Sequence, residues 1–413
     1  MIAALVRSLP PLRRKWKPLN FSNTNFTRIS PNQKIEEEAF PDYVASRYYP
    51  AHIGETFIDR YQIVGKLGFG ASSTVWLARD LRLHSHRRHV VLKLYVNSDS
   101  MGKYLDDELN TYRRMENGSK QHPGYNAVRS LLDSFNLDGP GGQHRCLVHP
   151  PLWESISAFL RRNPVLKLPP PVLAFVLRRL FLALDFLHRE CQIIHTDIKA
   201  DNIMFGIQDD SVFEAFEEEE LQNPSPRKVL TDRTVYASRA LTMPREWGSP
   251  VLCDFGSAVS GETEHVEDIQ PDIYRAPEVI LQIPWTYSVD IWNVGCMIWD
   301  VFEGGHLFTG RDPEAQIYRS RAHLAEMIAL LGQPSPDLLA RGGLSHEFFS
   351  PEGNFSAKVE LPDRVSLEER ETGLEGRDKE GFLRLMRKMV EWEPSKRCSA
   401  KELADDEWIQ KNL

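Results

Sequence analysis

The amino-acid sequence predicts an α+β protein with two lobes, a small β-rich lobe followed by a larger helical lobe. Three β-rich runs lie between Tyr61 and Tyr95, whereas from about Trp153 onward the apolar residues recur with helical spacing. The chain has 413 residues, which is enough for one large two-lobed domain and its tails. We therefore place the first lobe, with the segment before it, at residues 41–152 and the second lobe at residues 153–413.

The first lobe is predicted to consist of small strands and one helix. Residues 61–64 and 74–78 have the composition of strands joined through a glycine-containing turn, and residues 89–95 form a third β-rich run. In residues 105–115 the apolar side chains are spaced for one face of a helix. Residues 146–148 are a further short strand.

The second lobe is predicted to be helical, with one interruption. Residues 171–189 form an apolar-periodic helix that starts with proline, residues 289–303 form another, and further helices follow to Trp408. Residues from about 206 to 248 contain four consecutive glutamates and then an Asn-Pro-Ser-Pro run. This composition indicates a solvated, partly mobile surface insertion, with a regulatory role as the alternative.

The overall composition is that of an ordinary soluble globular protein, with 41% hydrophobic and 26% charged residues. Its net charge is −8, from 50 Lys and Arg against 58 Asp and Glu, whereas nucleic-acid binders usually carry a basic domain. No apolar run approaches the roughly 20 residues that cross a bilayer. The five scattered cysteines fit reduced thiols in the cytoplasm or nucleus. We therefore expect no direct nucleic-acid partner and no membrane association.

The first 40 residues are basic. No acidic residue precedes Glu36, and seven lysines and arginines lie before it. This composition is typical of a mitochondrial presequence, but Pro10 and Pro11 would interrupt its amphipathic helix. Residues 1–40 are therefore either a disordered basic extension or a targeting segment.

The stretch His195–Asn202 combines an acid, a cation and an amide in one short loop. Asp197 could accept a proton from a hydroxyl nucleophile, and Lys199 could stabilise a transferring phosphoryl group. Asn202, five residues after the acid, could hold a metal ion. This is the spacing of the H-R-D-x-x-x-x-N loop of phosphoryl-transfer enzymes, with Thr196 in the arginine position.

A second group of candidate residues lies in the first lobe. Gly68 and Gly70, between two predicted strands, would let the backbone close over nucleotide phosphates. Lys93 lies on the third strand, where a lysine normally points to solvent. In the context of a phosphoryl-transfer enzyme with such a loop, this lysine would pair with an acid on the following helix. Glu108 is the better candidate, because Asp107 is shorter and faces a different side of the helix.

Three further motifs follow in order along the chain. Asp254-Phe255-Gly256 comes after the insertion on a short strand, and Ala276-Pro277-Glu278 follows it. We expect Asp290 to hold the backbone of the loop at His195–Asn202 through hydrogen bonds. We expect Glu278 and Arg397 to form a buried ion pair, in which loss of one partner would cost about 3–5 kcal/mol.

With these motifs in order, residues from about 57 to 411 resemble a eukaryotic protein kinase. The run Tyr274–Glu278 and the long segment from Gly304 to about Leu374 are similar to the CMGC group of kinases. The loop His195–Lys199 and the run Glu267–Gln270 are similar to the serine/arginine-rich (SR) protein kinases, especially their fungal members. The resemblance implies the bilobal protein-kinase fold.

The resemblance also implies ATP and Mg²⁺ as cofactors and assigns roles to single residues. Asp197 and Lys199 would be catalytic, and Asn202 and Asp254 would bind magnesium. Lys199 fits the pattern of kinases that phosphorylate Ser or Thr. The residues implied in ATP binding are Leu67, Gly68, Phe69, Gly70, Ala71, Ser72, Ser73, Val75, Val91, Lys93, Glu108 and Leu152.

The sequence departs from the family pattern at several positions. Thr196 cannot form the charged pair by which an arginine grips an activation-loop phosphate, so we expect activity without such a phosphate. Pro271 and Asp272 replace a hydroxyl and reverse a charge beside the expected substrate path, which leaves specificity for Arg/Ser-rich proteins open. In the expected hinge, His149 would be the gatekeeper residue, and adenine would bind the Pro150 carbonyl and the Leu152 N–H.

The predicted function is therefore a serine/threonine protein kinase that acts as a monomer in the cytoplasm and nucleus. Its predicted partners are ATP and a protein substrate, for which an Arg/Ser-rich protein is one candidate. One alternative is a pseudokinase that serves as a scaffold or binding module, although Lys93, Asp197 and Asp254 are all present. A second is a small-molecule kinase, which the Ala276-Pro277-Glu278 motif disfavours. The basic N-terminus leaves a mitochondrial location as the alternative.

Overall fold

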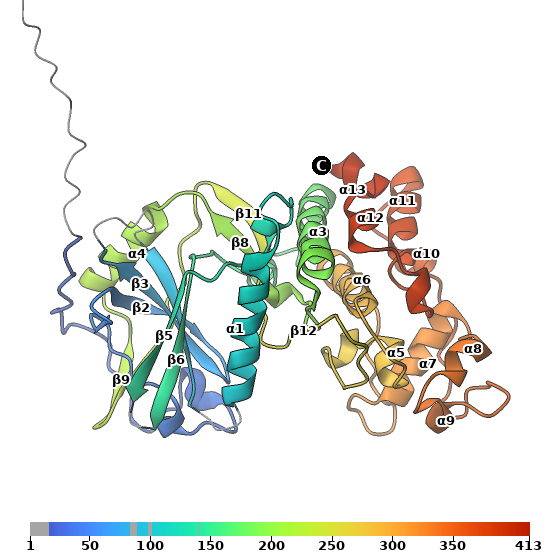
Figure 1. Ribbon diagram of the computed structural model, residues 1–413, viewed down its shortest axis with the longest axis horizontal. Coiled ribbons are helices and arrows are strands. Elements are labelled where there is room, and N and C mark those ends of the chain that lie inside the picture. Colours follow the sequence, from blue (N-terminus) through green and yellow to red (C-terminus); the bar gives the residue numbers. More distant parts are fainter. Residues whose placement is uncertain (1–15, 83–88, 98–100, 140) are drawn as a thin grey trace, which may run out of the picture. The chain divides into compact units, whose positions relative to one another are not determined.

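A computed structural model describes residues 16–82, 89–97, 101–139 and 141–413. The chain folds into two units that are each discontinuous in sequence. The first unit comprises the described residues up to Gly102 together with Ser130–Trp153 and Ile207–Trp247. The second comprises Lys103–Arg129, Glu154–Gly206 and Gly248–Leu413. The first unit is built mainly on a β-sheet and the second mainly on helices (Figure 1), which confirms the predicted α+β class.

The first unit is built on a six-stranded antiparallel sheet in the order β1-β2-β3-β4-β6-β5. One face of this sheet carries a hydrophobic core of alternate residues such as Trp76, Leu92 and Val148, as the period of two in a strand requires. Ala51 and Tyr236, from outside the sheet, complete this core. The strands are β1 (Thr56–Phe57), β2 (Tyr61–Phe69), β3 (Ser73–Asp80), β4 (His89–Tyr95), β5 (Asp133–Gly139) and β6 (Gly142–His149).

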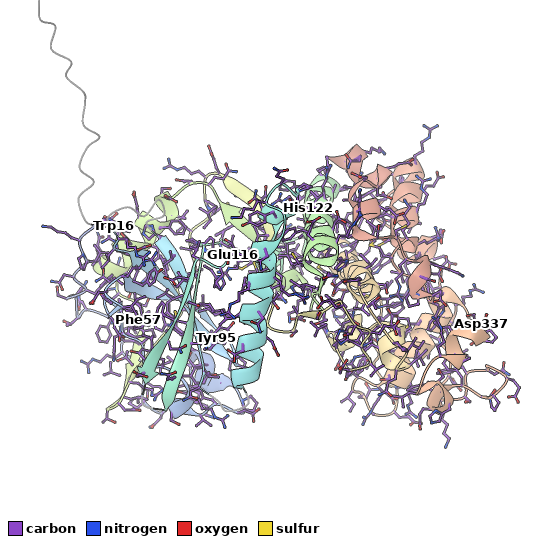
Figure 2. All side chains as sticks on the ribbon, viewed as in Figure 1. Trp16, Phe57, Tyr95, Glu116, His122 and Asp337 are labelled. Atoms are coloured by element: carbon purple, nitrogen blue, oxygen red, sulfur yellow. The ribbon has the colours of Figure 1, made fainter. Side chains whose placement is uncertain are left out.

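The N-terminal segment packs along the first unit, which corrects the prediction of a disordered extension for residues 16–40. Trp16, which is labelled in Figure 2, packs against two side chains of the sheet. The Arg79 guanidinium lies 3.5 Å from the centroid of its ring, and the centroid of the His89 ring lies at 5.1 Å. The Leu19 N–H donates to the Gln62 side chain at 2.8 Å. The targeting alternative rests largely on residues 1–15, which lie outside the described residues.

The insertion between His195–Asn202 and Asp254-Phe255-Gly256 is folded and belongs to the first unit, as Ile207–Trp247. The prediction of a solvated segment within the helical lobe is therefore wrong, although its boundaries were close. Two of the four consecutive glutamates are buried: Glu217 pairs with Arg79 at 2.9 Å, and Glu220 lies within 3.3 Å of arginines of the insertion. The insertion contains α4 (Ser211–Gln222), β9 (Arg227–Val229) and β10 (Thr234–Tyr236), the last two paired as a hairpin.

The helix predicted at 105–115 is longer and groups with the second unit. It is α1 (Met101–Asn117), and its residues from Lys103 onward belong to that unit. The physical reason is packing: the Tyr112 ring lies edge-on to Phe255 at 5.5 Å, and Arg114 pairs with Glu262 at 2.6 Å.

The second unit is mainly helical, and its described residues also form two short strand pairs. The helix predicted at 171–189 is α3 (Pro170–Asp185), continued by a π-helical turn to Cys191. The other helices are α2 (Ile156–Arg162), α5 (Pro277–Ile280), α6 (Ser288–Glu303), α7 (Ser320–Leu331), α8 (Pro336–Ala340), α9 (Ser345–Phe348), α10 (Leu367–Arg370), α11 (Gly376–Arg387), α12 (Ala400–Ala404) and α13 (Glu407–Asn412), and the strands are β7 (Ile193–Ile194) with β12 (Val259–Ser260), and β8 (Ile203–Ile207) with β11 (Trp247–Leu252).

The sequence also predicted that the chain has no membrane-spanning segment and that its cysteines are reduced. Among the described residues, no helix has the length and apolar character that crossing a membrane requires. The five cysteines carry free thiols, and burial raises the pKa of the Cys146 and Cys296 thiols well above the ordinary value.

Candidate active site

Three polar side chains of the second unit converge in the loop after β7. Lys199 Nζ lies 2.7 Å from Asp197 Oδ2, and Asn202 Nδ2 donates to the same oxygen at 2.9 Å. Asn202 Nδ2 also donates to the Asp197 carbonyl oxygen at 2.9 Å. A single 3₁₀ turn at Ala200–Asn202 folds the amide back onto the acid. Because both donors contact Oδ2, Oδ1 is the oxygen that can accept a proton from a substrate hydroxyl.

Asp290, near the start of α6, fixes the backbone of this loop. Its carboxylate accepts the N–H of His195 at 2.9 Å and that of Thr196 at 2.8 Å, which confirms the prediction from the sequence. His188 contacts it at 2.8 Å. Burial by itself would raise the pKa of Asp290, but the hydrogen bonds and charge of His188, together with the His195 N–H, hold the pKa below its ordinary value. The carboxylate is therefore an ionised acceptor for the loop.

Thr196, in the usual arginine position, connects this loop to the chain after Asp254-Phe255-Gly256. Its Oγ1 donates to the Ser257 carbonyl at 2.8 Å, and the residue is 1% exposed. Its φ is +66°, a conformation that a β-branched residue rarely adopts and that costs on the order of 1–3 kcal/mol. The fold holds Thr196 in this conformation because Asp290 takes its N–H and Ser257 its hydroxyl.

The candidate metal ligands lie on adjoining backbone segments. The Cys253 N–H donates to the Asn202 carbonyl at 2.8 Å, so Asn202 adjoins the residue before Asp254. Both hydrogen bonds of the Asn202 side chain use Nδ2, so Oδ1 is its potential ligand atom. Carboxylate and amide oxygens suit Mg²⁺, which commonly binds one or two protein groups together with substrate phosphates. Within the described ranges, no group of three or more His, Cys, Asp or Glu could hold a metal.

Glu108 on α1 lies near Asp254. A Cβ added to Gly256 would lie 3.6 Å from Asp254 Oδ1 and 3.7 Å from Glu108 Oε2, so both carboxylates border this glycine. Glu108 is 2% exposed, whereas the neighbouring Asp107 is exposed to solvent. The burial agrees with the choice of Glu108 over Asp107 made from the sequence.

Four of the candidate nucleotide-binding residues, Gly68, Val75, Val91 and Lys93, share one face of the sheet of the first unit, whereas Phe69, opposite Thr74, lies on the other face. In the strand register, Val75 on β3 lies opposite Gly68 on β2 and opposite Lys93 on β4. Val91 lies two residues before Lys93 on β4 and is opposite His149 on β6. Residues directly opposite, and residues two apart, point to the same side of a sheet. This side is the one that does not carry the hydrophobic core.

The glycine loop, Leu67–Val75, leaves room for a ligand. A Cβ added to Gly68 would meet no other atom within 4 Å, so packing does not require glycine there. What glycine provides at this position is freedom of the backbone and space for a bound group. In the expected hinge, His149 ends β6 with Nδ1 at 3.0 Å from the Ser130 carbonyl, and Leu152 is 8% exposed.

Gln270 has a structural role that sequence reasoning missed. The backbone of Gln270 has a φ of +72°. Its side-chain Nε2 donates to the Val289 carbonyl and to Asn293 Oδ1, and its Oε1 accepts the N–H of Ala276, each at 2.9 Å or less. It thereby ties the segment Asp254–Glu278, here called the activation segment, to α6. A polar residue in a loop carries no local signal of this role, since its partners lie up to 23 residues away.

Glu278 and Arg397 form the predicted buried pair. The guanidinium donates from both terminal nitrogens to the two carboxylate oxygens at 2.5 and 2.8 Å, and both side chains are 0% exposed. Arg397 also donates to the carbonyls of Ser288 and Glu391. The pair joins the end of the activation segment to the C-terminal helices.

The comparisons with known proteins agree with this arrangement. A model of the protein kinase domain matches residues 241–409. A serine/threonine protein kinase of Aspergillus fumigatus is 41% identical over 390 residues, which cover 94% of this chain and 93% of that protein. The serine/threonine-protein kinase SRPK of Physarum polycephalum is 28% identical over 89% of this chain and 90% of its own length. SRSF protein kinase 3 of Homo sapiens is 23% identical over 91% and 90%.

One family accounts for the order of the motifs and for the α+β architecture with its two lobes. The same family includes the relative from Aspergillus fumigatus, which is 41% identical over almost the full length of both chains. The pseudokinase and small-molecule alternatives find no support among these relatives. This chain belongs to the protein kinase family, as a serine/threonine protein kinase of the CMGC group that resembles the SR protein kinases.

Proposed function

We propose that this kinase transfers the γ-phosphoryl group of ATP to Ser or Thr hydroxyls with Asp197 as the residue that accepts the hydroxyl proton. The observation that carries the proposal is the convergence of Lys199 Nζ and Asn202 Nδ2 on one Asp197 oxygen. These contacts fix the rotamer of the carboxylate and leave Oδ1 for the substrate hydroxyl. Lys199, beside the acid, would then stabilise negative charge on the transferring group.

The remaining assignments concern ATP and its metal. The glycine loop and Lys93 would bind the phosphates, Val75, Val91 and Leu152 would line the adenine site, and Glu108 would be the partner of Lys93. Asn202 and Asp254 would hold Mg²⁺, which would neutralise negative charge on the phosphates. The support is that the donor set suits this ion and that Val75, Val91 and Lys93 share one face of the sheet.

Treatment of the purified kinase with a phosphatase should leave its activity unchanged. Thr196 has no charge with which to bind a phosphate, and its hydroxyl already bonds to Ser257 in the activation segment. The pairing of β12 with β7 and the bonds of Gln270 hold the same segment. Activity before and after treatment measures the effect, with heat-inactivated phosphatase as the control. A large loss that mass spectrometry traces to residues 254–278 would contradict this prediction.

The proposed substrates are basic, Arg/Ser-rich proteins. Two exposed carboxylates flank Arg275, with Asp268 at 3.1 Å and 73% exposed, and Asp272 at 3.1 Å and 58% exposed. Together with the single guanidinium they leave one net negative charge beside the expected peptide path. Two relatives whose names designate SRPK and SRSF protein kinases point to the same class.

In a peptide library, Arg-flanked serines should be phosphorylated in preference to serines flanked by acids or followed by proline. The substitution Asp272→Asn should reduce this preference up to about fivefold in kcat/KM, since an exposed ion pair contributes about 0.2–1 kcal/mol. The control is Asp337→Asn, which removes an exposed carboxylate of α8. A library preference for acidic or proline-directed sites would refute the proposed substrate class.

We further propose that the kinase is a monomer of the cytoplasm and nucleus. The scattered free thiols support a reducing compartment. Imaging of a fluorescent C-terminal fusion tests the location, and mitochondrial fluorescence would refute it.

A further inference from the structure

A buried lysine of the first unit stands directly before the glycine loop. Lys66, on β2, is 1% exposed, and its ammonium contacts Glu37, lies 3.4 Å from Glu36 Oε2 and donates to the Tyr236 carbonyl at 3.3 Å. The register of β2 against β3 shifts twice here, between Ile63 and Gly65 and between Lys66 and Gly68. Such irregularities re-aim side chains out of the regular alternation. They place Lys66 where the N-terminal segment and the insertion both reach it.

The N-terminal segment also contacts the glycine loop itself. The Phe40 ring lies edge-on to the ring of Phe69 at 5.9 Å. The Tyr48 hydroxyl donates to the carbonyl of Ala71 at 3.0 Å and lies 3.4 Å from that of Gly70. Burial, and after it the charge of Glu37, raise the pKa of the Tyr48 phenol, so it stays protonated as a donor.

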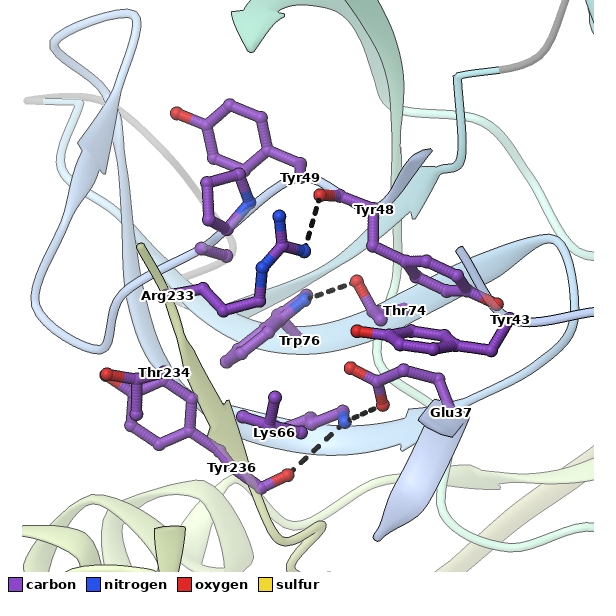
Figure 3. A pocket seen from close by; sticks show the side chains of 13 residues that line it. Glu37, Tyr43, Tyr48, Tyr49, Lys66, Thr74, Trp76, Arg233, Thr234 and Tyr236 are labelled. Atoms are coloured by element: carbon purple, nitrogen blue, oxygen red, sulfur yellow. Dashed lines mark hydrogen bonds and ion pairs between the residues drawn. The ribbon is translucent and has the colours of Figure 1, made fainter. Parts of the chain in front are cut away.

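The folded insertion also contacts the N-terminal segment. Arg233, in the turn between β9 and β10, donates to the Ala45 carbonyl and lies 3.4 Å from that of Tyr48. On α4, the Phe216 ring packs so closely on Gly65 that a Cβ there would lie 2.7 Å from it. Figure 3 shows the pocket where the three pieces meet, with Glu37 and Tyr48 from the N-terminal segment, Lys66 and Trp76 from the sheet, and Arg233 and Tyr236 from the insertion.

The Tyr48 hydroxyl donates to carbonyl groups of the glycine loop and so leaves the N–H groups of the loop available for a ligand. A peptide unit is planar, so fixing the carbonyls of Gly70 and Ala71 also fixes the N–H groups of Ala71 and Ser72. Those N–H groups are the donors with which a glycine loop binds phosphate. Without such contacts, a loop with two glycines loses much conformational entropy when it closes on a ligand.

We propose that residues Glu36–Tyr48, held by the insertion, form a built-in brace for the glycine loop, in which Tyr48 and Phe40 are positioning residues for ATP. The inference rests on the proposed role of the glycine loop in binding ATP phosphates. The brace places the loop donors before the nucleotide arrives, and so it lowers the entropy lost on binding.

The test is Tyr48→Phe, which removes the hydroxyl and keeps the ring. The KM for ATP should rise about 2- to 10-fold, the range of one net hydrogen bond, while the KM for the peptide stays unchanged. In the nucleotide-free protein, amide hydrogen exchange in residues 68–73 should become faster. The matched control is Tyr49→Phe, because that hydroxyl bonds to Glu55 and not to the loop. A second variant, Phe40→Leu, probes the ring contact separately and should act in the same direction.

The outcomes separate the brace from the proposed function. If wild-type protein fails to bind Mg-ADP in a calorimetric titration, the assignment of the glycine loop to nucleotide fails. If wild type binds but Tyr48→Phe and Phe40→Leu both match Tyr49→Phe in exchange and in KM for ATP, the brace is refuted. A rise in the KM of ATP and of peptide alike would also refute it, since that reports general damage.

Discussion

Replacing Asp197 with asparagine should lower kcat for protein phosphorylation about 10²- to 10⁴-fold, the usual contribution of a positioned general base. The substitution keeps the shape of the side chain and a hydrogen-bonding oxygen, but removes the group that accepts the hydroxyl proton. Lys199 and Asn202 keep a partner, so the loop should keep its conformation. Initial rates on an Arg/Ser peptide measure the effect. The control is Asp363→Asn, an exposed carboxylate in a loop of the second unit.

Binding of nucleotide should survive this substitution, because Asp197 is assigned to the acceptor and not to ATP. Calorimetric titration with Mg-ADP should therefore give the same affinity for Asp197→Asn and for wild type. Equal rates of phosphorylation in the two proteins would reject the catalytic assignment.

Replacing Arg397 with methionine should lower the free energy of unfolding by about 3–5 kcal/mol, because Glu278 would remain as a buried charge without its partner. Both side chains are fully buried, so water cannot compensate. The double variant Arg397→Met/Glu278→Leu should recover much of the loss, since it removes both charges. Urea denaturation of the three proteins provides the comparison.

A matched control for this experiment is Arg384→Met. Arg384 pairs with Glu407 at 3.3 Å, but the two side chains are 62% and 88% exposed. An exposed pair contributes about 0–1 kcal/mol, so this variant should be nearly as stable as wild type. Equal losses at Arg397 and Arg384 would show that burial does not govern the effect.

Some of the site could be predicted from the sequence because its chemistry is local. The spacing within His195–Asn202 already indicates which groups meet. The contacts of Asp290 and the Glu278–Arg397 pair were expected because these residues complete the kinase pattern that the sequence resembles. Charged residues in fixed order constrain a fold strongly, because each buried charge needs a partner. The structure bears out those contacts of Asp290 and Arg397.

The brace could not be predicted because its contacts join distant segments. Glu36 accepts from the Ser238 hydroxyl, 202 residues away, and Glu38 pairs with Lys228 at 2.6 Å. From the sequence alone, a run of glutamates is predicted to be exposed to solvent because its partners are unknown. In the structure, however, Glu217 and Glu220 are buried and form ion pairs with arginines. Neither segment has a periodicity that would indicate burial, so composition alone was misleading for both.

The discontinuity of the first unit bears on how the protein is made. The core of its sheet includes Tyr236, and its second part ends at Trp153, well before the insertion begins at Ile207. During synthesis, the intervening residues of the second unit must leave the ribosome before the insertion can dock. Closing such long-range contacts is intrinsically slow, and unfinished sheets are prone to aggregation. We therefore expect the nascent sheet to expose part of its core until the insertion has been synthesised, and a fragment that stops before Tyr236 lacks part of that core.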